Sequence, residues 1–293
     1  MTIKGIMFLR TFDQYKIWLF VLLLLLMGCK TAVYPATPIP SPPTIPPPTP
    51  TTIITPLPIA PDSGWQLRQA GVEERTITIG EGDGKKRLYI VRLDPAQVTF
   101  RVGYHAGAGQ SLTAWLDESG AMLAVNGGYF DEADVATGLV VSDGAATGVS
   151  HGTFAGMFAV TDSGASVNWL ADVPYFDDDD PYLYEERMTQ AVQSFPLLVK
   201  PGGVMGYPDE DGATARRTVV GQDGNGRFLF ILAVNGRFTL HQLSQWLVES
   251  DLGLEVGLNL DGGTSTGLRF ADGDGVAAFA LLPVVILVEE KGR

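Results

Sequence analysis

Cysteine is almost absent from this chain. Cys29 is the single cysteine among 293 residues, and it precedes all of the sequence that could form a globular domain. An intrachain disulfide is therefore excluded, as are cysteine catalysis and dithiol redox chemistry. Histidine is also scarce: His105, His151 and His241 lie far apart without ligand-like spacing, so the sequence does not indicate a histidine metal site.

Basic residues are also few relative to acidic residues. The chain has 20 basic and 33 acidic residues and a net charge of −13. Four of the basic residues and one of the acidic residues precede Asp62, which leaves 16 basic and 32 acidic residues after that point, a net charge of −16. Because binding to phosphate backbones depends on clustered Lys and Arg, nucleic acid is excluded as the expected partner.

Long apolar runs are missing except for one near the N-terminus. Basic residues precede the unbroken run Ile17–Met27, which ends in Leu26-Met27-Gly28-Cys29. This is the layout of a secretory signal, and the run is short for a membrane span. Leu-x-Gly-Cys resembles the bacterial lipobox, which predicts lipidation of Cys29 after cleavage of a signal peptide over residues 1–29. The alternative is an uncleaved N-terminal anchor. Either way we expect an exported protein tethered to the lipid bilayer on its extracytoplasmic side.

Residues 30–61 are rich in proline and threonine, as in Pro42-Pro43-Thr44-Ile45-Pro46-Pro47-Pro48. This composition cannot build a core and favours extended polyproline II structure. At about 3.1 Å per residue, such a linker would reach on the order of 80–90 Å. We interpret it as a spacer between the membrane and one domain over residues 62–293. A docking site for a proline-binding partner is the alternative.

The domain shows many short strands and few helices. Because strands and helices do not alternate regularly, a Rossmann or TIM layout is disfavoured. The expected fold is a single α+β domain with a large mixed β-sheet core and a few flanking helices. Helices are predicted over Leu112–Glu118, with Ser111 as N-cap, and Leu240–Glu249. The strand candidates are Arg75–Ile79, Arg87–Leu93, Val98–Tyr104, Met122–Val125, Gly138–Val141, Phe154–Thr161, Arg217–Gly221, Phe228–Val234, Leu254–Leu260 and Val284–Glu289.

The segment Leu258–Gly267 is the strongest candidate for a site. Apolar residues alternate with small or polar ones up to Leu260, as in a half-buried strand. The strand stops at Asp261, and the following Gly262-Gly263 permits positive φ values. One carboxylate would then lie at a strand tip beside backbone amides and the hydroxyls of Thr264-Ser265-Thr266. Such a cluster could hold a sugar, a phosphate or a metal, whereas an ordinary Asp-Gly-Gly hairpin turn is the simpler alternative.

Three further segments end on polar groups. Asn126-Gly127-Gly128-Tyr129-Phe130 follows an apolar strand, and its aromatic rings could stack on a pyranose. Gln193-Ser194 precedes the apolar segment Phe195–Leu198. Arg216-Arg217-Thr218 begins a strand, so its two arginines would point to opposite faces. In an acidic domain an inward arginine suits a carboxylate or phosphate. The alternative for this arginine is a structural ion pair with a neighbour such as Asp261.

Together these motifs resemble the phosphodiester glycosidase family. The segments that carry the resemblance occur in the family's order, and the similarity extends from about Lys85 to the C-terminus. Thr264 stands where the family commonly has glycine and Phe195 where it has Gly or Ala, and neither change removes a functional group. The four segments are Asn-Gly-Gly-Tyr-Phe at 126–130, Gln-Ser-Phe-Pro-Leu-Leu at 193–198, Arg-Thr-Val-Val-Gly at 217–221 and Leu-Asp-Gly-Gly-Thr-Ser at 260–265.

The resemblance implies hydrolysis of a sugar-1-phosphate diester at the anomeric carbon, on cell-envelope or extracellular glycans. Arg217 would hold the departing phosphate, and Asp261 would act as nucleophile or as base toward water. The substrate-binding residues implied are Asn126, Gly127, Gly128, Phe130, Gln193, Ser194, Thr218, Gly262, Gly263, Thr264 and Ser265, which would orient the sugar and the oxyanion.

Other interpretations stay open. A divalent cation, Ca²⁺ or Mg²⁺, could bind at Asp261, although no cofactor is required by the motifs. The run Asp177-Asp178-Asp179-Asp180 lacks EF-hand spacing and is better interpreted as a solvated loop than as a calcium site. An aspartic protease is rejected, because it needs two such carboxylates and Asp143-Gly144-Ala145 lacks the hydroxyl. The rival functions are a non-catalytic, polysaccharide-binding envelope lipoprotein and a hydrolase of another bond.

Overall fold

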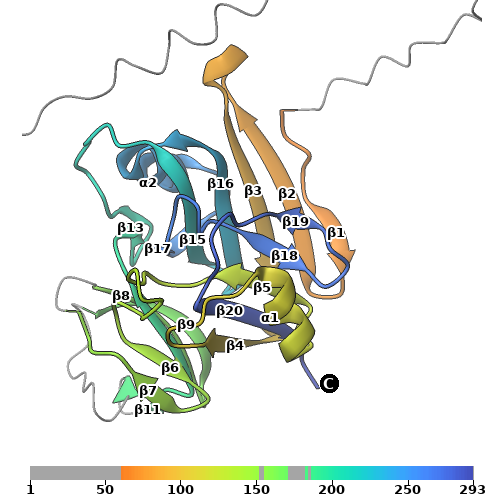
Figure 1. Ribbon diagram of the computed structural model, residues 1–293. Coiled ribbons are helices and arrows are strands. Elements are labelled where there is room, and N and C mark those ends of the chain that lie inside the picture. Colours follow the sequence, from red (N-terminus) through yellow and green to blue (C-terminus); the bar gives the residue numbers. More distant parts are fainter. Residues whose placement is uncertain (1–60, 152–154, 171–181, 184–185, 293) are drawn as a thin grey trace, which may run out of the picture. The chain divides into compact units, whose positions relative to one another are not determined.

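The computed structural model describes residues 61–151, 155–170, 182–183 and 186–292. Every described residue belongs to one compact unit, Leu57–Arg293. Its core is built from three main sheets and two α-helices (Figure 1). No helix among the described residues has the length and apolar character needed to cross a membrane.

The largest sheet has eight strands. It contains the long central strands that position most of the candidate residues, flanked by shorter strands at both edges. In spatial order the strands are β1 (Gln66–Gln69), β2 (Val72–Ile79), β3 (Lys86–Leu93), β16 (Phe228–Phe238), β15 (Ala215–Asp223), β17 (Leu254–Asn259), β13 (Leu197–Lys200) and β14 (Val204–Met205).

Two five-stranded sheets complete the core. The first, called the β5 sheet here, has the order β19 (Gly275–Val276), β18 (Leu268–Phe270), β5 (Leu123–Asn126), β20 (Val284–Glu290) and β4 (Val98–Tyr104). The second, called the β12 sheet, has the order β7 (Ala145–Thr147), β6 (Val140–Ser142), β12 (Gln190–Ser194), β8 (Gly156–Thr161) and β9 (Gly164–Trp169). A separate hairpin pairs β10 (Tyr182–Leu183) with β11 (Glu186–Arg187), and one 3₁₀ turn, η1, covers Gly82–Gly84.

The eight-stranded sheet is buried on both faces. Along β16, Phe228, Phe230 and Leu232 face a core shared by all three sheets. The alternate residues Leu229 and Ile231 face a second cluster, under helix α2. This alternation is the two-residue period of a strand, and because both faces are covered the sequence there is a continuous apolar run.

Each helix has a side-chain cap and covers one sheet. In α2 (Leu240–Glu249), the Thr239 hydroxyl accepts a hydrogen bond from the Gln242 N–H at 3.1 Å. In α1 (Leu112–Ser119), the predicted cap Ser111 accepts from the Ala114 N–H at 3.1 Å. Helix α1 packs on the β5 sheet, where Trp115 and Leu116 contact the cluster that includes Ala124, Val285 and Leu287.

The prediction of a mixed sheet was wrong. Every strand pair in the described part of the chain is antiparallel. The helical connections do join strands of the same direction, since α1 links β4 to β5 and α2 links β16 to β17. A third strand lies between each such pair, β20 in the first case and β15 in the second. The fold remains compatible with an α+β class.

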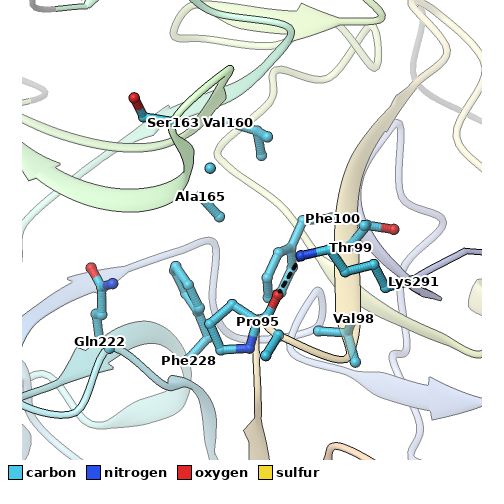
Figure 2. Close-up of a pocket in the computed structure, with 13 residues that line it drawn as sticks. Pro95, Val98, Thr99, Phe100, Val160, Ser163, Ala165, Gln222, Phe228 and Lys291 are labelled. Carbon is cyan, nitrogen blue, oxygen red and sulfur yellow. Dashed lines mark hydrogen bonds between the residues drawn. The ribbon is translucent and has the colours of Figure 1, made fainter.

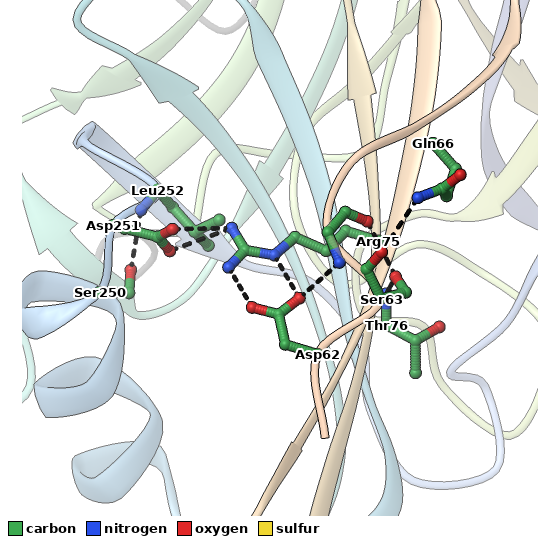
Figure 3. A network of polar contacts seen from close by, with 9 residues as sticks. Asp62, Ser63, Gln66, Arg75, Thr76, Ser250, Asp251 and Leu252 are labelled. Atoms are coloured by element: carbon green, nitrogen blue, oxygen red, sulfur yellow. Dashed lines mark hydrogen bonds and ion pairs between the residues drawn. The ribbon is translucent and has the colours of Figure 1, made fainter. Parts of the chain in front are cut away.

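A buried arginine ties the first described residues to the rest of the unit. Arg75 is 8% exposed and lies between two carboxylates, as Figure 3 shows. Its Nε donates to Asp62 at 2.9 Å and its Nη1 to Asp251 at 2.9 Å. Hydrogen bonding from Arg75 lowers the pKa of Asp62 from 3.8 to about 2. The start of the unit is thereby held against the loop that follows α2.

Candidate active site

The motif residues meet where strands of two sheets end. Strand β5 ends at Asn126, β17 ends two residues before Asp261, and β15 begins at Ala215. The Asp261 N–H donates to the Gly127 carbonyl at 3.0 Å, which joins the end of β17 to the end of β5. The Leu260 N–H donates to the Thr218 carbonyl at 2.8 Å, and the Gly263 N–H donates to the Arg216 carbonyl at 2.9 Å. The turn that carries Asp261 is therefore fixed from both sheets.

Asp261 is the only carboxylate that the four motifs contribute. Its Oδ1 accepts a hydrogen bond from the Gly262 N–H at 2.8 Å. Burial raises the pKa of Asp261 above its ordinary value of 3.8, and hydrogen bonds from the Ser265 hydroxyl and the Gly262 N–H oppose that rise. A carboxylate in this environment holds its proton more strongly than one in water, which suits a group that exchanges protons or charge during a reaction.

Glycine is required at each of the two positions after Asp261 for a different structural reason. Gly263 adopts a φ of 60°, in the left-handed region that side chains disfavour. At Gly262 an added Cβ would lie 2.8 Å from the Arg216 carbonyl oxygen. The motif therefore permits a close approach of the turn to β15, as well as the change in chain direction.

Arg217 lies beside this turn. Its Cδ is 3.8 Å from the position that a Cβ on Gly262 would take. Its Nη2 donates to the Ala213 carbonyl at 2.8 Å, while its Nε is buried without a hydrogen-bond partner among the described residues. The ion pairs of the described residues include none for Arg216 or Arg217. The alternative of a structural pair with Asp261 is therefore not what the structure shows.

Asn126 is held by hydrogen bonds to three other parts of the site. It is fully buried, and its Oδ1 accepts from the Thr218 hydroxyl at 2.7 Å and the Gly267 N–H at 3.1 Å. Its Nδ2 donates to the Asp261 carbonyl at 2.8 Å. A direct sugar contact stays a prediction, but these bonds make Asn126 a residue that positions Asp261. The Thr218 side chain belongs to the same bonded group.

Asn259 was missing from the predicted site, and Tyr129 was predicted only as a ring that could stack on a sugar. The Asn259 Nδ2 donates to the Tyr129 hydroxyl at 2.7 Å, and this hydroxyl donates to the Phe195 carbonyl at 2.8 Å. Burial raises the pKa of Tyr129 to about 12, and the negative charge of Asp261 contributes while Arg217 opposes. Asn259 could have been found from the sequence, because it lies two positions before Asp261 and shares its face of the strand.

Gln193 and Ser194 lie at the end of β12. Gln193 accepts hydrogen bonds from the backbone N–H groups of Leu139 at 3.1 Å and His151 at 2.9 Å, and its Nε2 donates to the Ser150 hydroxyl at 2.9 Å. The strand approaches the first motif closely, since a Cβ on Gly128 would be 2.9 Å from the Gln193 carbonyl. The Ser194 Oγ is buried without a partner in the described part of the chain.

The remaining predicted residues lie around this centre in different surroundings. A Cβ on Gly127 would be 2.5 Å from a Val284 methyl group, so this glycine serves packing. Phe130 packs against the cluster under α1 instead of facing Asp261 freely. Thr264 is exposed, and its carbonyl accepts from the N–H groups of Phe279 at 2.7 Å and Ala280 at 3.1 Å.

The described residues contain no group of three or more His, Cys, Asp or Glu side chains arranged to hold a metal ion. The acidic run Asp177–Asp180 and the lipidation candidate Cys29 both lie outside the described residues. The structure therefore leaves both of these predictions as they were made.

A cavity of about 360 Å³ lies at the opposite end of β15, where the three sheets meet (Figure 2). Phe100 and Phe228 form part of its wall, and Gln222 and Lys291 lie at its polar edge. None of its lining residues is acidic, and it shares none with the four motifs. The cavity is therefore separate from the predicted site around Asp261.

A carboxylate fixed beside an arginine at converging strand ends is an arrangement suited to hydrolysis of a phosphorylated sugar. The model of the phosphodiester glycosidase family matches residues 119–282, more than half of the chain. This protein belongs to the phosphodiester glycosidase family. The matched range is narrower than the resemblance seen in the sequence and contains all four motifs. Membership in this family indicates a hydrolase.

Solved structures share the fold at low sequence identity. The catalytic domain of zebrafish N-acetylglucosamine-1-phosphodiester alpha-N-acetylglucosaminidase, auto-inhibited by its pro-peptide, is 18% identical with a TM-score of 0.58, covering 77% of this chain and 86% of its own. A hypothetical protein from Synechocystis is 15% identical with a TM-score of 0.56, covering 75% of this chain, and the match spans 62% of that protein's length. A putative exported protein from Burkholderia pseudomallei is 12% identical with a TM-score of 0.50, covering 70% and 74%. No curated protein matches the chain.

Proposed function

We propose that this protein hydrolyses a sugar-1-phosphate diester at the anomeric carbon, releasing the sugar and leaving a phosphomonoester. The observation that carries the proposal is the pair of Asp261, whose pKa is raised by burial, and Arg217, whose buried Nε has no partner among the described residues. The motif positions supply a negative and a positive group at one turn, which are the two charges that this reaction needs.

The reaction explains why one carboxylate suffices. A phosphomonoester is a good leaving group, so its departure needs a cation more than it needs strong protonation. Arg217 supplies that cation and can grip phosphate oxygens with its planar fork. Asp261 faces the oxocarbenium-like anomeric centre, either as nucleophile or as base toward water. A glycoside with a poor leaving group would need a second carboxyl group as acid.

The surrounding groups have supporting roles in this proposal. The Ser265 hydroxyl and the Gly262 N–H hold the Asp261 carboxylate through hydrogen bonds. Asn126 fixes the Asp261 backbone. Tyr129, held by Asn259, lies close enough to Asp261 and Arg217 for both charges to affect its pKa. A fixed arrangement of this kind lowers the cost of reorganising dipoles when charge develops in the transition state.

We also propose that the protein is exported and held on the membrane by a lipid on Cys29, with residues 30–61 as spacer. The support is the sequence alone: the apolar run before Leu26-Met27-Gly28-Cys29 and the proline-rich composition that follows. In that location the substrate would be a glycan of the cell envelope or its surroundings. Metabolic labelling with a radioactive fatty acid tests this, and a Cys29→Ala variant that still incorporates label would contradict it.

The test of activity uses the full chain and sugar-1-phosphate diesters, including UDP-N-acetylglucosamine and a phosphodiester-linked disaccharide. Released reducing sugar is followed by NMR, with and without EDTA, and the anomer formed first distinguishes retention from inversion. We expect Asp261→Asn to lower the rate by about 10²- to 10⁴-fold, the usual contribution of such a group. Arg217→Gln should also lower it.

Asp117→Asn is the matched control, because Asp117 is exposed on α1 and belongs to none of the four motifs; its rate should equal that of the wild type. Full activity of folded Asp261→Asn or Arg217→Gln protein would overturn the residue assignment. If no sugar is released but ligand resonances broaden, the chain is a glycan-binding protein instead.

A further inference from the structure

Arg216 is a partly buried cation with no ion-pair partner among the described residues. Its Nη2 donates to the Ala277 carbonyl at 2.9 Å, but its Nε and Nη1 are buried with no partner among the described residues. The ion pairs found in the described part of the chain do not include it. Burial accordingly lowers the pKa of Arg216. Buried guanidinium nitrogens without a hydrogen-bond partner are costly, and a ligand that accepts hydrogen bonds from them would remove that cost.

The unpaired atoms gather around the candidate site. In the described residues, buried side-chain atoms without partners occur on Ser194, Arg216, Arg217, Asn259, Thr266 and His241. All of these except His241 belong to the four motifs or adjoin them in sequence. Most are hydrogen-bond donors, and the arginines are positively charged. These donors fit an anionic ligand that offers several acceptor oxygens.

Phe279 lies against the outer side of Arg216. The Arg216 Cζ is 4.5 Å from the centroid of the Phe279 ring, and Phe279 is 74% exposed. The Phe279 N–H donates to the Thr264 carbonyl at 2.7 Å, which binds this loop to the Asp261 turn. The ring offsets part of the cost of the buried charge through a cation–π contact. It gives Nε and Nη1 no acceptor.

The two arginines flank the same turn. Arg217 lies against Gly262, whereas Arg216 reaches the Ala277 carbonyl and the ring of Phe279, whose N–H donates to the Thr264 carbonyl in the turn. Both arginines therefore contact residues in or bonded to the segment 262–264. In a domain with a net charge of −16, two adjacent arginines with no carboxylate partner among the described residues suit a ligand with more than one negative charge.

We propose that Arg216 and Phe279 form a second anion subsite on the leaving-group side, so that the preferred substrates are sugar diphosphates, with two linked phosphate groups. The inference rests on the proposed function, since it takes Arg217 as the ligand of the departing phosphate. The first phosphate binds Arg217 and the second binds Arg216. Phe279 lines the path by which the rest of the leaving group exits to solvent.

The test compares inorganic pyrophosphate with inorganic phosphate by isothermal titration calorimetry on the full chain. A second charge-assisted contact should make pyrophosphate bind about 10- to 100-fold more tightly than phosphate. Arg216→Gln should remove this preference and leave phosphate binding nearly unchanged. Arg216→Lys should retain part of it, because the charge stays while the planar fork is lost.

Arg237→Gln is the matched control, since Arg237 is exposed on β16 and its loss changes the net charge equally; the preference should persist there. Equal affinities in the wild type, binding of neither anion, or an unchanged preference in folded Arg216→Gln protein would each overturn the subsite. Hydrolysis of sugar-1-phosphate diesters is measured separately. Hydrolysis without a pyrophosphate preference rejects only the subsite, and the preference without hydrolysis rejects only the proposed reaction.

Discussion

At the scale of single residues, the protonation of Asp261 is set by its burial. The folded chain raises the pKa of this carboxyl group above 3.8, so the folded state binds the proton more tightly than the unfolded chain. The free energy of unfolding therefore falls as pH rises from about 4 through the raised pKa, because the unfolded state gains more from ionisation. The same shift implies that the proposed hydrolysis, in which Asp261 acts as a carboxylate, is lost at a higher pH than it would be with an exposed Asp.

Asp261→Asn should therefore be more stable than the wild type at pH 7, with a difference that shrinks toward pH 3. An amide oxygen can still accept from the Gly262 N–H, so the structural bond is retained. Urea unfolding at a series of pH values measures the difference. A stability difference that is constant across pH would show that Asp261 has no raised pKa. Asp117→Asn serves as the exposed comparison.

Asn126 is predicted to matter for stability as much as for activity. Its removal in Asn126→Ala leaves the Thr218 hydroxyl, the Gly267 N–H and the Asp261 carbonyl without their partner. Each buried group left unpaired costs about 1–3 kcal/mol, so unfolding should be easier by at least about 2 kcal/mol. Chemical denaturation measures this. A change below 0.5 kcal/mol would mean that water replaces the amide.

At the scale of elements, the ends of strands build the site. Strand β12 lies in the middle of its sheet with all five residues buried, although three of them, Gln190, Gln193 and Ser194, are polar. Its glutamine side chains are satisfied within the fold: Gln190 accepts from the Val102 N–H at 2.9 Å and Gln193 from the Leu139 N–H at 3.1 Å. Polar residues can thus be central when the chain supplies their partners.

Helix α2 shows what one cap contributes. Thr239 accepts from the Gln242 N–H and donates to Glu210 at 2.8 Å. Thr239→Ala should lower the free energy of unfolding by about 1 kcal/mol. Gln245→Ala, on the exposed face of the same helix, should change it by less than about 0.5 kcal/mol. Thermal unfolding of both variants measures the effect, and equal effects would mean that the cap is not what stabilises the helix start.

At the scale of the whole folded unit, Arg75 joins the beginning of the unit to the end of α2. It is buried, whereas the side chains of its partners Asp62 and Asp251 are 42% and 68% exposed. Arg75→Gln should lower the free energy of unfolding by about 1–3 kcal/mol, which lies between the values for exposed and buried ion pairs. Because the pKa of Asp62 is lowered from 3.8 to about 2, its contribution is present above pH 4 and lost as pH falls through about 2.

Hydrogen exchange measures the same change locally. In Arg75→Gln, protection should fall in β2 and in the loop at Asp251, and the stability difference from the wild type should shrink in acid. Arg87→Gln is a control, because Arg87 is an exposed residue of the neighbouring strand β3. Unchanged exchange at both segments would show that the network does not hold them together.

The sequence by itself determined the local elements and the chemistry. The predicted bounds of Val98–Tyr104 and Leu240–Glu249 match β4 and α2, because periodicity and capping are properties of neighbouring residues. The motif around Asp261 and the family were also accessible, since both depend on residue types in order along the chain.

Only the tertiary structure decided the sheet directions and the partners of the polar side chains. β15 lies between β16 and β17, and β20 lies between β4 and β5, so the strands of the same direction are not paired with each other. No local pattern records these insertions. The contact of Asn126 with Asp261 spans 135 positions, and that of Tyr129 with Asn259 spans 130. Such distant contacts decide which groups the buried side-chain amide of Asn126 binds. They also decide whether the guanidinium of Arg216 has a partner. Burial and hydrogen-bond satisfaction are properties of the assembled core, so they follow from the fold and not from the motif.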